Sequence, residues 1–427
     1  MKIAFFVAEF PVLSETFVIR QVAGMVRAGH EVTVIAGQWG DRALTHGAYR
    51  ECGLEERVVV LRPPGGRAAQ MRALAQLAAR ALGSGSARRA LRTGLTAALQ
   101  GSRASLFDIA GMSGRSALGR FDAVIAHFGQ AGVRAMHLQQ AGLLAGPLAT
   151  IFHGFDVSDR ATLARLRKGY QALYAHCARL LPISHLWQSR LRDWGAPAGK
   201  IEVLRMGVDV ASLSLLSPQR PLHRPLRVLS VARLTEKKGI AYAINGVRAA
   251  SSEIHFRIIG SGPEENGLRA SASELPAGKR IEFLGRRPHA EVFEQLAWAD
   301  VFLLPSVTAS GGDMEGIPVA LMEAMAKGVL VLATRHSGIP ELIDNGQNGF
   351  LVPERDATAI AAGLDRLAAL ADPGEIREAA RRKVEMAFDE AQLLGQLERI
   401  CRSMAGAADR SGPEPRFAEG LPSQETL

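Results

Sequence analysis

The sequence Glu315-Gly-Ile-Pro-Val-Ala-Leu-Met-Glu323 follows closely on a short apolar stretch at residues 301–304 that is typical of a buried strand. Proline is favoured in the first turn of a helix, where its missing N–H is not needed, so we expect a helix to begin at Pro318. Glu315 then lies in the loop before the helix. Glu323 lies inside the helix, about 8 Å from Pro318 along the axis. A strand, a loop and a helix in this order form one unit of an α/β fold.

The two glutamates lie on either side of a helix N-terminus, whose free N–H groups attract anions. A phosphate bound there would repel both carboxylates, so we expect them to bind hydroxyl groups on either side of it. Hydroxyl, diphosphate and hydroxyl is the polarity pattern of a nucleotide sugar. A capping acid and a solvated helical glutamate explain the two residues equally well when this stretch is taken alone.

Short apolar runs alternate with helical patterns along the chain, which indicates parallel sheets covered on both faces. A chain of 427 residues is too long for one ordinary core. We predict an α/β fold of two Rossmann-like, doubly wound domains that face each other across a cleft, where such sheets bind ligands. Strands are expected at 3–8, 31–36, 57–61, 123–126, 148–152, 180–183 and 201–204, and then at 226–232, 254–259, 280–284, 301–304, 329–333 and 349–352.

Breaks in this pattern predict the domain boundaries. Residues 210–225 contain three prolines and little periodicity, so they are expected to link a first domain at 1–209 to a second at 226–388. A helix at 389–404 is expected to pack back on the first domain. Residues 405–427, rich in Gly, Pro, Ser and charge, are expected to be disordered.

The composition is that of a soluble globular protein, with 47% apolar and 22% charged residues. No run of about 18 apolar residues is present, so we expect no membrane-spanning helix. The three cysteines, Cys52, Cys177 and Cys401, are scattered. Their number and spacing argue for a reducing cytoplasm and against a disulfide framework or a metal site.

The net charge of +9 is concentrated at residues 62–120, which contain ten arginines, no lysine, no glutamate and one aspartate, Asp108. Apolar residues recur there at helical spacing. Helices with one apolar and one arginine-rich face suit an anionic membrane surface, which predicts a peripheral position on the inner face of the plasma membrane. A helical insertion that is basic only on its solvent side is the alternative. No nucleic acid is expected, because the segment has one aromatic residue, Phe107, and no recognisable module.

Two cations follow the first strand of the second domain. Arg233 and Lys238 are placed to point into the cleft, where they could neutralise a leaving diphosphate without a metal. Surface cations beside Glu236 are the alternative interpretation. Gly260 and Gly262 follow the next strand, in a tight turn that would let a nucleotide approach the backbone.

Polar residues of the first domain are expected to face the same cleft. His153 can hydrogen-bond a sugar hydroxyl, although a buried structural histidine also fits, and Asp156 is a possible acceptor contact. His127, after the preceding strand, could reach the acceptor or act as a base, but a structural role is the stronger interpretation. We find no Asp-X-Asp pair and no His/Cys cluster with ligand spacing, so we expect neither a metal nor a cofactor.

Together these motifs resemble the retaining glycosyltransferases of family 4, which have the GT-B fold. The resemblance covers roughly residues 1–404. Near the N-terminus, Phe10-Pro-Val-Leu-Ser-Glu-Thr-Phe17 resembles the colanic acid and exopolysaccharide subgroup. The other residues that carry the resemblance are Arg233, Lys238-Gly239, Gly260-Ser-Gly262, Phe283-Leu-Gly285, Glu315, Glu323-Ala-Met-Ala and Ser337-Gly-Ile-Pro-Glu-Leu342.

The resemblance implies metal-independent transfer of a hexose from a nucleotide sugar to a lipid-linked glycan, with retention of configuration. It implies that Glu315 and His153 contact the donor sugar, and that Arg233 and Lys238 stabilise the departing nucleoside diphosphate. Glu323 would hold the ribose. The backbone of Leu284 would meet the base, and that of Gly316, Ile317, Pro318, Val319 and Ala320 would meet the phosphate and sugar.

The first loop departs from the family pattern. Many members have a Gly-Gly pair there, where this chain has Pro11-Val-Leu-Ser14-Glu15. We expect Ser14 to cap the first helix, and we expect Ser14 and Glu15 to contact the acceptor or the sugar in place of a close backbone approach to the phosphate.

Other functions are compatible with part of the pattern. A nucleotide-sugar epimerase or a glycogen-type phosphorylase could use the same fold, and a membrane or assembly scaffold without catalysis would not bind nucleotide at all. A dehydrogenase is disfavoured, because the first strand leads into Pro11 with no Gly-X-Gly-X-X-Gly at the turn.

Overall fold

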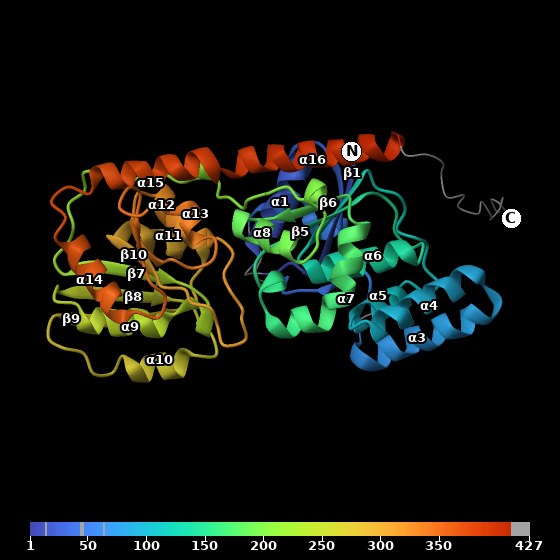
Figure 1. The fold of residues 1–427 in the computed structure, drawn as a ribbon, viewed down its shortest axis with the longest axis horizontal. Coiled ribbons are helices and arrows are strands. Elements are labelled where there is room, and N and C mark those ends of the chain that lie inside the picture. Colours follow the sequence, from blue (N-terminus) through green and yellow to red (C-terminus); the bar gives the residue numbers. More distant parts are fainter. Residues whose placement is uncertain (13–14, 43–46, 63–64, 411–427) are drawn as a thin grey trace.

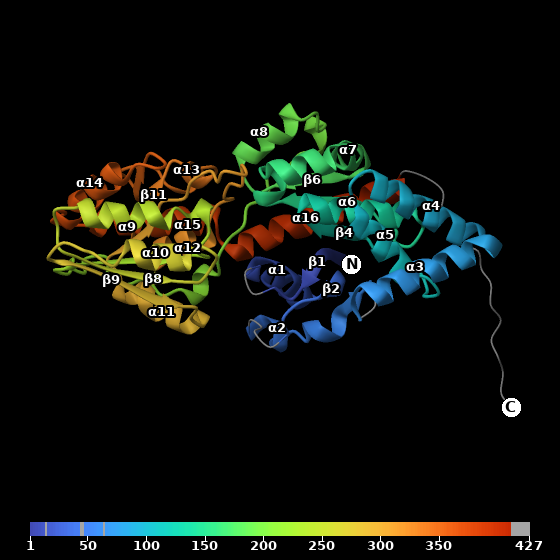
Figure 2. The same cartoon turned by 90° about the horizontal axis from the view of Figure 1, so that it is seen from below.

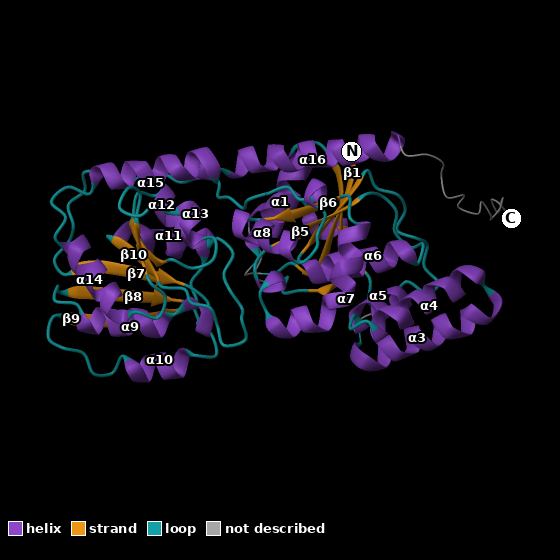
Figure 3. Ribbon diagram, viewed as in Figure 1, coloured by secondary structure: helices purple, strands orange, loops and turns teal. Residues whose placement is uncertain are grey.

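The computed structural model describes residues 1–12, 15–42, 47–62 and 65–410. It contains two parallel six-stranded sheets, each covered by helices, and the two domains lie side by side along the long axis (Figures 1 and 3). The predicted α/β fold with two doubly wound domains is therefore confirmed. Both sheets have the nucleotide-binding order in which the first and fourth strands are adjacent at the centre.

The first sheet has the order β3-β2-β1-β4-β5-β6. Its strands are β1 (Lys2–Phe10), β2 (Glu31–Trp39), β3 (Val58–Val60), β4 (Ala123–His127), β5 (Leu148–Phe152) and β6 (Arg179–Pro182). The helices of this domain are α1 (Thr16–Arg27), α2 (Gly47–Glu51), α3 (Gly66–Gly83), α4 (Gly85–Leu99), α5 (Arg103–Gly111), α6 (Gly129–Gln140), α7 (Arg160–His176) and α8 (His185–Asp193).

The second sheet has the order β12-β11-β10-β7-β8-β9. Its strands are β7 (Leu226–Val231), β8 (Ile254–Ile259), β9 (Lys279–Gly285), β10 (Val301–Leu304), β11 (Leu330–Thr334) and β12 (Phe350–Val352). The helices of this domain are α9 (Ile240–Ala249), α10 (Glu265–Ser271), α11 (His289–Trp298), α12 (Val319–Ala326), α13 (Ile339–Leu342), α14 (Ala357–Ala368) and α15 (Gly374–Ala387), and the last helix of the chain is α16 (Glu390–Arg410).

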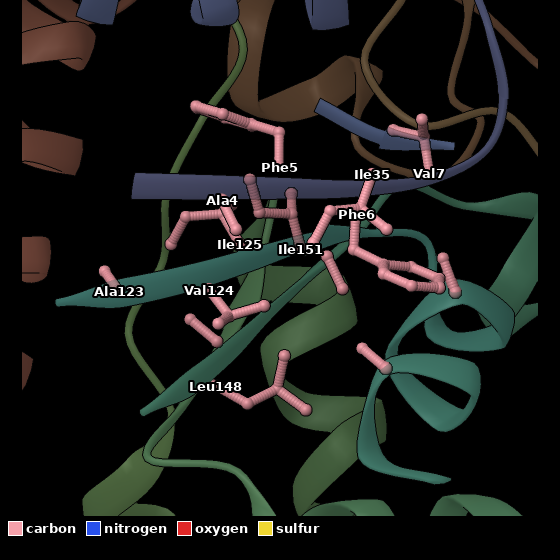
Figure 4. Close-up of a cluster of buried hydrophobic side chains, with 14 of the residues drawn as sticks. Ala4, Phe5, Phe6, Val7, Ile35, Ala123, Val124, Ile125, Leu148 and Ile151 are labelled. Carbon is pink, nitrogen blue, oxygen red and sulfur yellow. The ribbon is translucent and has the colours of Figure 1, made fainter. Parts of the chain in front are cut away.

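The central strands are apolar on both sides because helices cover both faces of each sheet. In the first domain, Phe5 and Phe6 of β1 are fully buried and lie on opposite faces of the sheet, as successive residues of a strand must (Figure 4). Ile125 of β4 and Ile151 of β5 continue this core (Figure 4). This packing fixes the strand ends, and with them the loops that form the cleft.

The chain crosses between the domains at two points that lie against each other. Met206 packs in the first core and Val208 in the second, so the change of core comes slightly before the predicted boundary at 209. The returning chain passes Val208, whose N–H donates to the Phe388 carbonyl at 2.9 Å and whose carbonyl accepts from Glu390 N–H at 2.9 Å. The paired crossing forms a narrow hinge.

Helix α16 returns to the first domain along its outside (Figure 1). Its buried residues Leu397, Ile400, Cys401 and Met404 join the first core. The helix continues to Arg410, so the predicted disorder from residue 405 is wrong for 405–410. Residues 411–427 lie outside the described part of the chain.

Two further predictions about elements are wrong. No strand forms at 201–204, although Glu202 N–H and Leu204 N–H donate to the carbonyls of Leu180 and Pro182 in β6. Pro182 has no N–H to return, which stops the ladder. Pro318 does not lie inside the helix; it is the extended N-cap residue, and α12 begins at Val319.

The basic segment forms a three-helix extension, α3 to α5, at the end of the first domain farthest from the second (Figures 1 and 2). Its apolar pattern is only partly buried: Leu77 is 3% exposed, but Leu82 and Leu99 are 87% and 90% exposed. Asp108 of α5 is fully buried and binds Arg62 at 2.8 Å and Arg134 of α6 at 2.6 Å. Among the described residues, no helix is long and apolar enough to cross a membrane.

We expect Asp108→Ala to lower the free energy of unfolding by about 3 kcal/mol, because it leaves the buried Arg134 guanidinium without a counter-charge. Chemical denaturation monitored by circular dichroism would measure the change. Asp193→Ala, at an exposed position of α8, serves as the control and should change stability by less than about 0.5 kcal/mol. An equally small effect of Asp108→Ala would contradict the structural role of the pair.

Candidate active site

Two glycines hold the loops of the two domains in direct backbone contact. A Cβ on Gly316 would lie 2.3 Å from the His153 carbonyl oxygen, and a Cβ on Gly154 would lie 2.9 Å from the Gly316 nitrogen. Gly154 also has φ +139°, which side chains rarely adopt. The contact places the loop after β5 against the loop before α12, so that His153 and Glu315 lie at the same junction.

Further hydrogen bonds cross this junction. Ser158 Oγ accepts from Met314 N–H at 2.9 Å, and Arg160 N–H donates to the Gly311 carbonyl at 3.0 Å. On the other side of the contact, Glu341 of α13 accepts from Leu186 N–H at the start of α8. The two domains are thus held close together in this structure.

Glu315 is buried and its carboxylate lies 2.9 Å from the Lys238 ammonium. Burial alone would raise the pKa of Glu315, but the nearby ammonium groups of Lys238 and Lys237 outweigh it and lower the pKa below its ordinary value. Glu315 is therefore an ionised carboxylate at neutral pH, which can accept hydrogen bonds and cannot donate them. Lys237 is paired separately, with Asp313 at 3.1 Å.

The backbone of Glu315 is held by two residues that follow β11. Its N–H donates to His336 Nε2 at 3.0 Å, and its carbonyl accepts from Ser337 Oγ at 2.6 Å. Because Nε2 accepts, the proton of a neutral His336 ring is on Nδ1, which lies 2.6 Å from Glu354. The second Glu354 oxygen accepts from Thr308 N–H. His336 thus connects the Glu315 loop to the rim of the sheet.

Sequence reasoning did not find His336 or Glu354. Their positions relative to the strands could have revealed them. His336 stands two residues after the end of β11, and Glu354 stands two residues after the end of β12. Both therefore lie at the edge where parallel sheets bind ligands.

The two cations differ in their surroundings. Lys238 is largely buried against Glu315, whereas Arg233 is exposed at the end of β7. Within the described part of the chain, no carboxylate pairs with the Arg233 guanidinium. Glu236, the alternative partner considered from the sequence, instead accepts from Ser310 and lies 3.7 Å from Arg355. Arg233 is therefore available to an anion.

Glu323 lies on the buried face of α12, and two basic side chains approach it. His289 Nε2 is 3.4 Å away, and Arg20 of α1 reaches across from the first domain to 3.8 Å. Arg20 also lies 3.5 Å from Glu390, the first residue of α16. Arg20 and His289 were missed by the sequence analysis, because neither follows a motif that points to the site.

His153 and His127 form a buried pair. His127 Nδ1 lies 3.1 Å from His153 Nε2, and His153 Nδ1 lies 3.2 Å from the Met206 sulfur. Burial lowers the pKa of His127 to about 3 and holds that of His153 well below its usual value, with His127 adding to the effect on His153. Both rings are therefore neutral at physiological pH, and His127 is enclosed, which agrees with the structural interpretation of that residue.

Asp156 is wholly buried and faces the backbone, so the structure does not support the expected contact with an acceptor. Its carboxylate accepts from the N–H groups of Gly129 at 2.8 Å, and of His153 and Gly154 at 2.9 Å each. Burial raises its pKa to about 6 in spite of these bonds. Asp156 fixes the turn that presents His153 and joins it to the start of α6.

The glycines after β8 allow two neighbouring loops to pack closely. A Cβ on Gly260 would lie 1.8 Å from the Ala232 carbonyl oxygen, and a Cβ on Gly262 would lie 2.2 Å from that of Leu234. These glycines let the loops after β7 and β8 pack together, which supports the backbone around Arg233. Leu284 lies near the end of β9, Gly316, Ile317 and Pro318 precede α12, and Val319 and Ala320 are its first two residues.

The first loop is described only in part. Ser14 lies outside the described residues, and Glu15 takes the N-cap position of α1 without a side-chain capping bond. Burial, reinforced by the charge of Glu9, raises the pKa of Glu15 to about 7. Among the described residues, no group of three or more His, Cys, Asp or Glu is arranged to hold a metal ion.

Two sheets of nucleotide-binding topology, joined by a hinge and meeting at a charged junction, define the GT-B class. Two family descriptions match the chain: "Glycosyltransferase Family 4" at residues 14–212 and "Glycosyl transferases group 1" at residues 217–384. The chain is 41% identical to the putative colanic acid biosynthesis glycosyltransferase WcaL of Escherichia coli K12, over 95% of this chain and 100% of that protein. This chain belongs to glycosyltransferase family 4.

Other relatives agree with this assignment. The amylovoran biosynthesis glycosyltransferase AmsK of Erwinia amylovora is 40% identical over 95% of this chain and all of its own length. Among solved structures, Anabaena Alr3699/HepE in complex with UDP-glucose has a TM-score of 0.67 at 19% identity, and covers 94% of this chain and all of its own. At that identity the structural likeness supports the fold alone.

We expect His336→Leu to raise the KM for the donor and lower kcat, because the buried Glu315 N–H loses its acceptor and the loop that carries the carboxylate is no longer fixed. A loss in kcat/KM of about tenfold corresponds to one such bond. His336→Gln offers an amide oxygen to the same N–H and should recover part of the loss.

Steady-state kinetics on the two variants and thermal unfolding would separate positioning from stability. Equal loss of activity in both variants, in proportion to loss of folded protein, would show that His336 acts only through stability.

Proposed function

We propose that this glycosyltransferase moves a hexose from a nucleoside diphosphate sugar to a lipid-linked glycan, with retention of configuration, in the synthesis of a cell-surface polysaccharide. The observation that carries the proposal is the junction at which the ionised Glu315 and its partner Lys238, in one domain, meet the His153 loop of the other. Arg233, which has no carboxylate partner among the described residues, follows β7 in the same domain as Lys238. The similarity to WcaL and AmsK, glycosyltransferases of colanic acid and amylovoran biosynthesis, supports the polysaccharide context, and the UDP-glucose bound to HepE supports a UDP-sugar donor.

In this proposal, each charged side chain of the site binds a different part of the nucleotide sugar. Glu315 accepts hydrogen bonds from sugar hydroxyls, which only an ionised carboxylate does with both oxygens. Arg233 and Lys238 stabilise the negative charge that develops on the departing diphosphate, together with the free N–H groups at the start of α12. Glu323 binds the ribose hydroxyls, and the Leu284 backbone meets the base.

His153 completes the sugar site from the opposite domain. Its Nδ1 faces the Met206 sulfur, which is a weak hydrogen-bond acceptor, so exchange of that contact for a sugar hydroxyl costs little. Because His153 is neutral, it donates or accepts a hydrogen bond without adding charge.

In the proposed reaction, the bond between the anomeric carbon and the diphosphate oxygen breaks while the acceptor oxygen bonds to the same face of that carbon. The acceptor's proton passes to the departing phosphate oxygen, so no protein base is required. The two cations balance the leaving charge, and we propose that the reaction needs no metal.

We further propose that the enzyme is cytoplasmic and works at the inner face of the plasma membrane, where a lipid-linked acceptor resides. The support is the arginine-rich extension of α3 to α5, with its exposed leucines.

We expect Glu315→Gln to lower kcat/KM by roughly 100-fold, in the range found when one preorganised polar group is lost from an active site. The amide removes the charge that holds Lys238 and one strong acceptor for the sugar. A transfer assay with uridine and guanosine diphosphate sugars would measure the change.

Glu378→Gln is the matched control, since Glu378 is a partly exposed residue of α15 whose ion-pair partner among the described residues is Arg382, one turn away. Near-normal transfer by Glu315→Gln would contradict the proposal. Conversion of the donor without any acceptor would instead identify an epimerase.

We expect dialysis against EDTA to leave the transfer rate unchanged, because Arg233 and Lys238 take the place of a divalent cation at the diphosphate. The same enzyme dialysed against buffer alone is the control. A loss of activity that magnesium or manganese restores would show that the cations are not sufficient.

A further inference from the structure

The three-helix extension carries a groove that the proposed reaction does not use. The groove has a volume of about 600 Å³ and lies between α4, the C-terminal half of α6, and α7. It is at the end of the first domain away from the cleft, since α4 lies far from the second domain in both views (Figures 1 and 2). The side chains from α4 that line it include Arg88, Arg89, Arg92, Thr93 and Thr96.

The positive charge of this groove is not compensated by the protein. No carboxylate is among its lining residues, and no ion pair of Arg88, Arg89 or Arg92 occurs in the part of the chain that the structure describes. Asp108, the single acid at residues 62–120, is fully buried and is bound to Arg62 and Arg134. Three guanidinium groups within five residues of a helix therefore face solvent without a counter-ion from the protein.

One wall of the groove is fixed by a hydrogen bond. Arg89 Nε donates to the Gln140 carbonyl at 2.7 Å, which satisfies a carbonyl at the C-terminal end of α6. This contact ties α4 to α6 and holds the Arg89 guanidinium at the groove. Arg88 and Arg92 are one turn apart on the same helix and are exposed beside it.

The same stripe of α4 becomes apolar toward its C-terminus. Residues 88, 92, 95 and 99 follow one face of the helix at spacings of three and four. Leu95 and Leu99 are 48% and 90% exposed, and Leu82, before the turn between α3 and α4, is 87% exposed. Exposed leucines next to unpaired arginines are the arrangement of a surface that meets phosphate and hydrocarbon together.

We propose that this groove binds the phosphate of an anionic membrane lipid, with Arg88 and Arg92 on the phosphate and Leu95 and Leu99 in the interfacial layer. Guanidinium groups bind phosphate oxygens in a bidentate manner, and the Thr93 and Thr96 hydroxyls supply further donors. The inference rests on the proposed membrane-associated function and assigns it to a defined site.

The test uses the full chain and sedimentation with phosphatidylcholine vesicles that contain or lack phosphatidylglycerol. Arg88→Gln combined with Arg92→Gln should lower the partition coefficient on the anionic vesicles by about 30-fold, from the usual contribution of two basic residues at such a surface. Arg67→Gln combined with Arg72→Gln removes the same charge from exposed positions of α3 outside the groove. This control should lower the partition coefficient on the anionic vesicles by less than about threefold.

A second variant tests the apolar part. Leu95→Ser combined with Leu99→Ser should also weaken binding to anionic vesicles, while leaving all ten arginines of the segment in place. Equal losses in the two arginine double variants would overturn the site, since that is the behaviour of unspecific attraction. Calorimetry with inorganic phosphate and glycerol phosphate distinguishes the source of the phosphate. Tight binding of either one, without binding to vesicles, would overturn the lipid assignment.

Failure of this proposal is distinguishable from failure of the proposed function. Binding of uridine and guanosine diphosphates, measured by calorimetry without vesicles, should be the same in the wild type and in the Arg88/Arg92 variant. If the wild type binds vesicles as expected but binds no nucleotide, the proposed sugar transfer is wrong, and the proposal that the groove binds a lipid phosphate is unaffected. If it transfers sugar but the groove variants bind vesicles normally, the groove is wrong.

Discussion

The backbone contact between Gly154 and Gly316 is the constraint on which the rest of the site depends. With a side chain at either position the two loops would overlap, so the approach of the domains is set by the absence of two Cβ atoms. Asp156 holds the first loop by accepting three backbone N–H groups, and His336 and Ser337 hold the second through the Glu315 backbone. Each loop is thus rigid before the domains meet, which is what a site shared between two bodies requires.

The electrostatics of the junction follow from this geometry. Glu315 is buried, and burial would favour its protonated form, but Lys238 at 2.9 Å reverses the effect. On the other side of the junction, burial lowers the pKa values of His127 and His153, with His127 adding to the effect on His153, so that both rings are neutral. At the contact between Glu315 and the His153 loop, the second domain therefore supplies the charge and the first supplies neutral hydrogen-bonding groups, while Arg20 of the first domain lies farther along, 3.8 Å from Glu323. This division matches a ligand whose charged end lies in the second domain and whose sugar lies between the two.

Much of the fold could be predicted from the sequence, because strands of a parallel sheet are apolar on both faces and stand out as short runs between helices. The strand predicted at 201–204 failed for a local reason, the missing N–H of Pro182, which apolarity does not reveal. In the site, residues in recognisable motifs were found, among them Glu315, Lys238 and His153. Arg20, His289, His336 and Glu354 were missed, since their positions depend on how helices and domains pack together. Gly260 and Gly262 make room for the chain itself, a role that the sequence did not reveal, and their approach to a nucleotide stays a prediction.

The hinge and the basic extension together bear on which of the two domains would move relative to the other. In the part of the chain that the structure describes, the crossings between the domains lie near Val208 and Phe388, a narrow connection about which rotation would require the loop contacts to open. The proposed lipid site belongs entirely to the first domain and lies at its far end. If that domain is held at a membrane, as proposed, the second domain is the part left free to rotate, and it carries the cations and Glu315 that the donor would meet. The donor site of the second domain would then open toward the solution, where the nucleotide sugar is found. The first-domain half of the cleft would stay beside the membrane, where the lipid-linked acceptor is found.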